Sequence, residues 1–146
     1  MSGRPRRIKH RPIDLDAIDT QNVEQRSMAS IPDSLDTLVA IDGAIAAALV
    51  DSLTGLVLGG AGSGIDLELA AAGNTEVVRA KQRTIAALGL DEAIEDILIT
   101  LSSQFHVIRP LTQNPEVFIY LVLDRKKANL ALARIKVKDV DAHLEL

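Results

Sequence analysis

The seven consecutive apolar residues from Val117 to Leu123 place the strongest constraint on how this chain can fold. The run is rich in β-branched and aromatic residues and has the length of a buried strand. Because side chains alternate between the two faces of a sheet, a strand that is apolar at every position needs cover on both faces. The sequence therefore predicts a central strand with helices on both sides of its sheet.

The chain from Ser30 onward divides into eight elements by hydrophobic period and turn residues. The longest helix is expected to start at Asp66, which can cap it, and to be closed by Gly89. Two more strand signals precede the central run, and the three are expected to form an antiparallel meander. The order is αββαβββα, an α+β fold, over residues 32–41, 44–51, 56–60, 66–88, 96–103, 105–112, 117–124 and 125–138.

The long helix has two apolar stripes and one polar strip on a helical wheel. The first stripe is made of small residues that would let the helix approach a sheet closely: Ala70, Gly73, Val77, Ala80, Thr84 and Ala87. The second stripe would then need another apolar partner, naturally a second subunit, and contains Leu67, Ala71, Val78 and Ile85. The polar strip is either a solvated face or a partner-binding face, and contains Glu76, Arg79, Gln82 and Arg83.

The N-terminal segment has an unusual charge distribution. Residues 1–12 carry five basic and no acidic residues, whereas residues 13–27 carry one basic residue against four acidic ones. With few large apolar residues, this segment lacks the burial needed to offset the entropy of ordering it. We expect a flexible charged tail over residues 1–29 and one domain over residues 30–146. The tail is either a solvated extension or a basic arm that touches phosphate, an acidic partner or a membrane surface.

Composition excludes several classes of function. The chain has no cysteine, which rules out disulfides, thiol nucleophiles and cysteine zinc sites. Only three of its 146 residues are aromatic, too few for the stacking platforms that bind single-stranded nucleic acid, so no nucleic-acid partner is expected. No apolar run is long enough to cross a bilayer and no secretory signal is recognisable, so we expect a cytoplasmic protein without integral membrane contact.

Few residues offer catalytic chemistry. The glycine-rich stretch 59–64 lacks the Lys-Ser/Thr of a phosphate-binding loop and the spacing of a dinucleotide fold, so we interpret it as a flexible turn. The three histidines do not cluster, so no metal or other cofactor is expected. A small enzyme using His106 and Arg109 is a weak alternative, because residues three apart on a strand point to opposite faces.

Three strings in the expected order resemble the roadblock family of dynein light chains and their bacterial relatives. They are LVAIDGAIAAALVD at residues 38–51, TGLVL at residues 54–58 and NLALAR at residues 129–134. The resemblance covers residues 33–138. It implies a profilin-like sandwich, in which a five-stranded antiparallel sheet carries the long helix on one face and the two terminal helices on the other.

The resemblance also implies a homodimer in which the third strands pair edge to edge and the long helices lie together. Combined with the second apolar stripe, this gives an expected interface of Leu67, Ala71, Val78, Ile85, Ile97 and Ile99. Lys81 lies between the two apolar stripes of the long helix, so the expected pairing of the helices would not be entirely apolar.

Bacterial members of the family typically bind and regulate a small Ras-like GTPase, in some cases speeding hydrolysis, whereas eukaryotic relatives act as adaptors. The family has no catalytic motif to carry over. The resemblance thus implies a non-enzymatic homodimeric regulator or scaffold for a small GTPase, for which we assign the polar strip of the long helix as the partner surface. The alternative is a profilin-like domain that senses a small molecule or acts as an adaptor without a GTPase.

Overall fold

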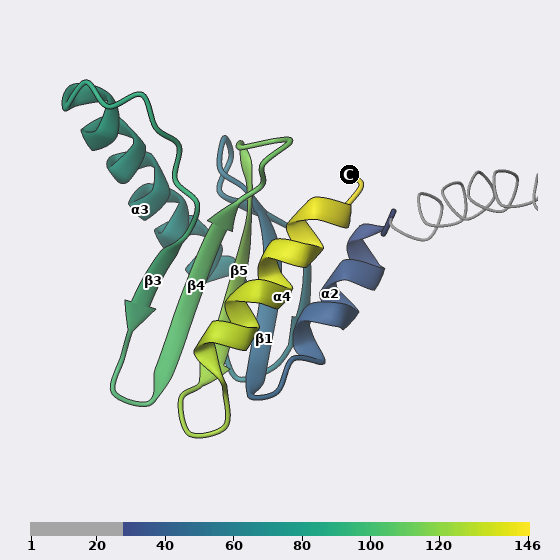
Figure 1. Cartoon of the computed structure of the whole chain (residues 1–146). Helices are drawn as coiled ribbons and strands as arrows, with labels where there is room; N and C mark the ends of the chain where they lie inside the picture. Colours follow the sequence, from purple (N-terminus) through teal and green to yellow (C-terminus); the bar gives the residue numbers. More distant parts are fainter. Residues whose placement is uncertain (1–27) are drawn as a thin grey trace, which may run out of the picture.

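The computed structural model describes residues 28–146. The expected tail over residues 1–29 therefore lies outside the described residues, apart from its last two. Eight elements follow in the predicted order (Figure 1): α2 (Ile31–Val39), β1 (Ala44–Asp51), β2 (Leu56–Gly62), α3 (Leu67–Ala87), β3 (Ile97–Thr100), β4 (Gln104–Pro110), β5 (Val117–Asp124) and α4 (Leu130–His143). Among residues 28–146 no helix is long and apolar enough to cross a membrane.

The strands form one five-stranded sheet in the order β2-β1-β5-β4-β3, with every neighbouring pair antiparallel. The apolar run of β5 lies in the middle of the sheet, and its residues from Val117 to Leu123 are all buried. The predicted α+β class and the meander of β3, β4 and β5 are confirmed. β2 and β3 form the two edges of the sheet.

Each face of the sheet has its own hydrophobic core. On one face, α2 and α4 bury residues such as Leu38 and Val137 against Leu49, Ile119 and Leu121. On the other face, α3 packs against a smaller cluster that includes Phe118 and Tyr120. Helices therefore cover both sides of β5, as its unbroken apolar pattern requires (Figure 1).

Short-range capping fixes the starts of the first two helices. The Ser30 hydroxyl accepts a hydrogen bond from the Asp33 amide at 3.2 Å, and the Asp66 carboxylate accepts one from the Leu69 amide at 3.1 Å. Both contacts satisfy amides that have no partner inside their own helix. The long helix thus follows its predicted cap at Asp66.

The last helix starts later than predicted. Asp124 does not cap it, because its carboxylate accepts from the Lys126 amide at 2.9 Å and closes a turn instead. Asn129 caps the helix through the Leu132 amide at 3.0 Å. The helix therefore runs from Leu130 to His143 rather than over residues 125–138.

The glycine-rich stretch is also not a turn throughout, because β2 continues to Gly62. A Cβ at position 60 would lie 2.8 Å from Cδ1 of Leu67, the first residue of α3, so glycine lets this side chain lie close on the edge strand. At the other edge, β3 covers only Ile97–Thr100 and not residues 96–103, and β4 covers Gln104–Pro110 rather than residues 105–112.

Candidate functional site

The second half of α3 is the least covered part of the helices in the described fold. Only Ala71, Thr75 and Val78 of this helix are buried, and from Arg79 to Ala87 every residue except the half-buried Ile85 is exposed. In Figure 1 the helix extends past the end of the sheet. A helix with about two and a half turns in solvent is incompletely packed within one chain, which makes this region the candidate functional site.

The structure corrects the expected roles of the two apolar stripes. Ala71 and Val78, expected at a subunit interface, are fully buried against the chain's own sheet. Leu67 packs on the same cluster, and Leu67 and Val78 bury more apolar surface on the sheet than the alanines and glycine of the other stripe would. The stripe expected to face the sheet is instead mainly exposed, as shown by Gly73, Val77, Ala80, Thr84 and Ala87.

An apolar groove of about 630 Å³ separates this exposed stripe from the start of edge strand β3. The α3 side contributes Val77, Ala80, Lys81, Thr84 and Ile85, and the strand side contributes Ile94, Asp96 and Ile97. Ile97 and Ile99, both expected at the interface, are half-buried and lie on the α3 face of the sheet. The groove therefore borders a strand edge that has no neighbouring strand within the described chain.

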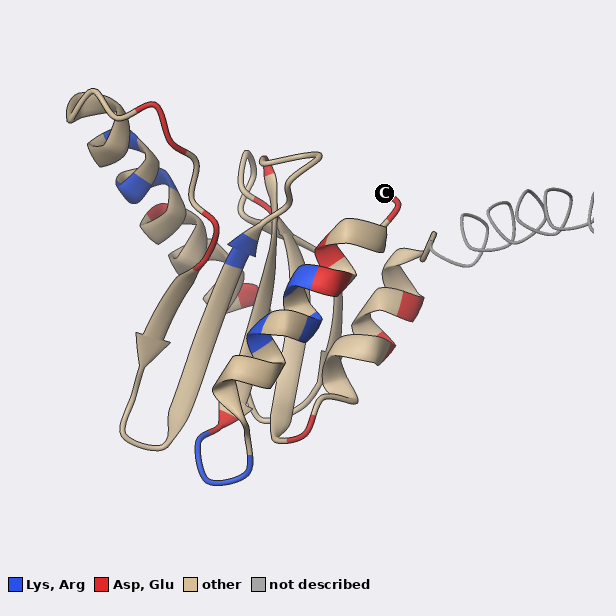
Figure 2. Cartoon of the chain, in the orientation of Figure 1, with Lys and Arg blue, Asp and Glu red and all other residues tan. Residues whose placement is uncertain are grey.

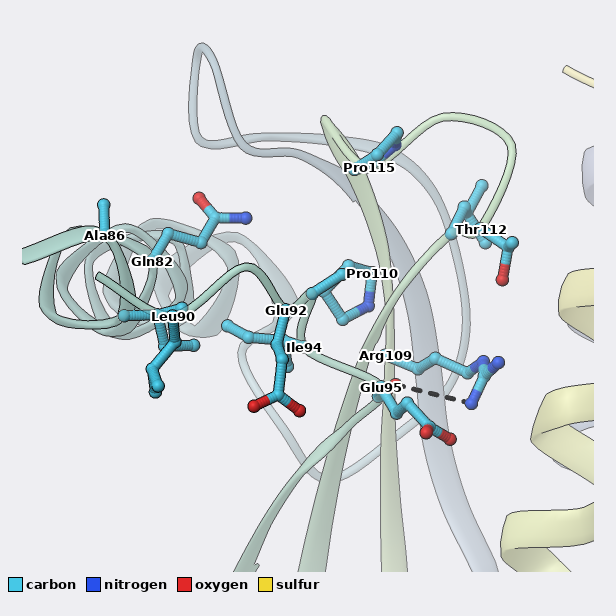
Figure 3. Close-up of a pocket in the computed structure, with 13 residues that line it drawn as sticks. Gln82, Ala86, Leu90, Glu92, Ile94, Glu95, Arg109, Pro110, Thr112 and Pro115 are labelled. Carbon is cyan, nitrogen blue, oxygen red and sulfur yellow. Dashed lines mark hydrogen bonds between the residues drawn. The ribbon is translucent and has the colours of Figure 1, made fainter. Parts of the chain in front are cut away.

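The predicted polar strip is split by the helix geometry. Glu76, Arg79 and Arg83 are exposed and fall within one side of α3 at three- and four-residue spacings. Gln82 instead lines a second cavity on the sheet side of the helix (Figure 3). The structure thus groups three of the four residues as one solvent-facing charged surface.

The second cavity, of about 430 Å³, lies between the end of α3, the segment leading into β3 and the β4–β5 loop. Leu90, Ile94 and Pro110 give it apolar walls, and Glu92 and Glu95 contribute carboxylates (Figure 3). Arg109 contributes to the lining, but its side chain extends away from α3 and its Nε donates to Asp141 on α4 at 2.8 Å. Its charge is therefore committed to holding α4 in place.

Three polar side chains on β4 and β5 form a hydrogen-bonded network on the α3 face of the sheet. The Tyr120 hydroxyl lies 3.0 Å from His106 Nδ1, and His106 Nε2 lies 2.9 Å from the Gln104 side-chain oxygen. Burial lowers the pKa of His106 below 6.5 and raises the pKa of Tyr120 above 10.0, the latter opposed by a hydrogen bond to Asn74 of α3. The neutral imidazole accepts from the tyrosine and donates to the glutamine, so this network joins β4 to the central strand.

Sequence reasoning did not find the buried cluster around Asp141. This carboxylate accepts from Arg109 and also from the backbone amide and hydroxyl of Thr112, at 2.9 and 2.8 Å. Arg109 lies on the α2 and α4 face, whereas His106 lies on the α3 face, so the sheet separates the two candidate enzyme residues as the strand period predicts. Within residues 28–146 no three His, Asp or Glu side chains form a group that could hold a metal ion.

No protein-family model matches this sequence, and no curated protein matches it. Several solved structures, however, are similar to this chain. MglB of Myxococcus xanthus superposes with a TM-score of 0.65 at 20% identity, covering 74% of this chain and 85% of that one. A Roadblock/LC7 domain from Streptomyces avermitilis superposes with a TM-score of 0.65 at 15% identity, covering 74% of this chain and 88% of that one. The gliding protein MglB from Thermus thermophilus superposes with a TM-score of 0.65 at 19% identity, covering 76% of this chain and 82% of that one. At these identities the likeness concerns the fold.

Proposed function

We propose that this chain, which has the roadblock fold, is a homodimeric, non-enzymatic regulator or scaffold that binds a small Ras-like GTPase. The similarity of fold to the MglB structures supports a roadblock-type regulator. The single observation that carries the proposal is the uncovered half of α3, which combines an apolar groove with a separate charged surface. A regulator of this kind needs no catalytic atoms, because binding one nucleotide state better shifts the populations of the GTPase switch loops.

The groove beside β3 is the proposed dimer surface. β3 is an edge strand whose four residues, Ile97–Thr100, include no charged residue and no proline, the usual protections of an exposed edge. Pairing with β3 of a second copy would satisfy its free backbone groups, and the partner's α3 would cover the groove side chains Val77 and Ile85. Lys81 lines the same groove, so its aliphatic stem would pack in the interface while its ammonium group reaches the rim.

The charged surface of Glu76, Arg79 and Arg83 is the proposed GTPase surface. At about 100° per residue, Arg79 lies about 160° around the helix from Val77 and Lys81. Arg79 therefore stays accessible when the groove is covered, and its guanidinium can form bidentate contacts with carboxylates of a partner.

The proposal is tested by affinity capture of proteins from native cell extract on the purified chain. One sample contains a non-hydrolysable GTP analogue and the other GDP, and the bound proteins are identified. We expect a small GTPase to be retained in one nucleotide state and to be lost when the bait carries Arg79→Glu and Arg83→Glu. The same proteins in both samples, with no GTPase among them, would contradict the proposal.

The cavity at the end of α3 supports a second candidate, a small-molecule sensor, since it combines apolar walls with two carboxylates. A sensor of this kind predicts a basic, partly apolar ligand that raises the melting temperature of the chain. Gln82 lines this cavity, so Gln82→Leu would then reduce the ligand-induced shift in melting temperature, whereas Arg83→Leu would not.

A further inference from the structure

The turn before α4 and the exposed side of α4 up to Lys138 carry a concentration of positive charge that only residues 1–12 match in this chain. Residues 125–138 hold six basic and no acidic residues, in a chain whose net charge is −4. Figure 2 shows them in the turn between β5 and α4 and along α4 itself. The whole segment lies on the α2 and α4 face of the sheet, opposite to α3.

Four of these six cations remain available to a partner. Arg134 is held by the Asp96 carboxylate, and Arg125 donates to the Leu101 carbonyl at 2.7 Å and stacks on Phe105. The others are exposed and belong to none of the ion pairs formed among residues 28–146: Lys126, Lys127, Lys136 and Lys138.

Apolar side chains are exposed among these lysines. Leu132 is 45% exposed and Ile135 is 64% exposed, and at three-residue spacing they lie next to each other on α4. A helix surface that places apolar side chains between cations fits a segment that is both acidic and apolar.

The chain itself contains such a segment. Residues 13–24 carry four acidic and no basic residues, and the acidic residues are interspersed with Ile13, Leu15, Ile18 and Val23. The chain enters the described fold beside α4, since the Ala29 amide donates to the His143 carbonyl at 2.8 Å and the Glu145 amide donates to the Ala29 carbonyl at 2.8 Å.

Chain length allows the contact. The fourteen residues of α4 span about 21 Å, whereas the fifteen residues from 13 to 27 can extend about 50 Å. A tether of this length gives an effective concentration of about millimolar, so weak individual contacts are enough.

We propose that residues 13–24 dock on the exposed side of α4, with their carboxylates on the four lysines and their apolar side chains on Leu132 and Ile135. Docking on this face leaves the α3 surface free. The proposal is independent of whether the partner of α3 is a GTPase.

Because the chain has no cysteine, a single spin label tests the contact without ambiguity. The full chain carries Ile18→Cys with a nitroxide, and amide signals are compared before and after reduction of the label. At low ionic strength we expect a several-fold loss of intensity at Leu132, Ile135 and Lys138, with α3 unaffected. A matched label at Ser2→Cys, on a flexible span of about 20 Å from residue 13, should give clearly smaller losses on α4. At about 1 M salt, where the Debye length is about 3 Å, the losses should disappear.

Charge exchange distinguishes a specific contact from general attraction. Reversing Asp14, Asp16 and Asp19 to Lys should remove the signal loss on α4, and reversing the four α4 lysines to Glu in the same chain should restore it. Glu68→Lys, a charge reversal at an exposed position of α3 on the opposite face of the sheet, serves as the control and should leave the α4 signals unchanged.

Three results would overturn the proposal. The first is an α4 response that does not differ between the two label positions, and the second is a response confined to another face. The third is binding of the wild-type chain to vesicles containing phosphatidylglycerol that depends on the α4 lysines but not on the three aspartates, which would assign this face to a membrane surface.

Discussion

The guanidinium of Arg109 lies 2.8 Å from the carboxylate of Asp141, and their side chains are only 10% and 2% exposed. This ion pair joins β4 to α4 across a separation of 32 residues. Thr112 donates two further hydrogen bonds to the same carboxylate, so both of its oxygens are used. The pair is therefore the main polar contact between the last helix and the sheet.

Removing one partner of this pair should be costly, because the other charge is left buried. We expect Arg109→Ala or Asp141→Ala to lower the free energy of unfolding by about 3–5 kcal/mol in urea titrations, and the double variant Arg109→Met with Asp141→Leu to lower it less. The exposed pair provides a control, since Arg134→Ala should cost about 1 kcal/mol or less. Equal losses at the two pairs would be inconsistent with this role for Asp141.

Gly43 should tolerate no side chain. It has a φ of +85°, and a Cβ there would lie 2.7 Å from the backbone nitrogen of Ala128. Gly89 has a φ of +72° with open space around it and is the matched control. Gly89→Ala should cost about 1–2 kcal/mol from backbone conformation alone, and Gly43→Ala clearly more, as measured by chemical unfolding. Equal costs would show that the contact with Ala128 can relax.

Local sequence signals were sufficient for most of the fold. β1, α3 and β5 follow their predicted limits closely, because a cap, a turn or an unbroken apolar run defines each of them within a few residues. The start of α4 was mispredicted because both Asp124 and Asn129 can act as caps, and the choice depends on the turn that Asp124 forms with Lys126.

Contacts between distant residues were not predictable in the same way. A helical wheel gives the angle between the two stripes of α3 but not which of them meets the sheet. That choice depends on Leu67 fitting against Gly60 and on Val78 packing on the cluster around Tyr120, which belong to other elements. The pairing of Arg109 with Asp141 likewise has no local signature.

The His106 network should make stability depend on pH. Because burial lowers the pKa of His106 in the folded state, the unfolded chain binds this proton more readily below about pH 6.5. The contribution of the histidine to stability is therefore complete above that pH and is lost as the pH falls through the folded pKa. Unfolding free energies measured between pH 7 and about pH 5 should fall less steeply in His106→Gln than in the wild-type chain. Parallel curves would contradict a buried, neutral His106.

Charge placed in the groove should separate the proposed dimer. Light scattering of the wild-type chain is expected to give about twice the monomer mass of 15.7 kDa. Val77→Glu, at a 40% exposed position lining the groove, should give the monomer mass with unchanged circular dichroism. Arg79→Glu, on the other side of α3, should remain dimeric. A wild-type monomer, or a dimer that Val77→Glu leaves intact, would contradict the proposed interface.

The central claim is state-selective binding of a small GTPase by the charged surface of α3, and a binding titration tests it most directly. The purified GTPase, loaded with either GDP or a non-hydrolysable GTP analogue, is titrated with the wild-type chain and with the variant carrying Arg79→Glu and Arg83→Glu. Lys81→Glu does not serve as the control here because it lies in the dimer groove, so Lys138→Glu on α4 is used instead. The account predicts at least tenfold preference for one nucleotide state, a difference of about 1.4 kcal/mol, which is lost in the arginine variant and kept in the Lys138 variant. Equal affinity for both states, or unchanged affinity of the arginine variant, would contradict it.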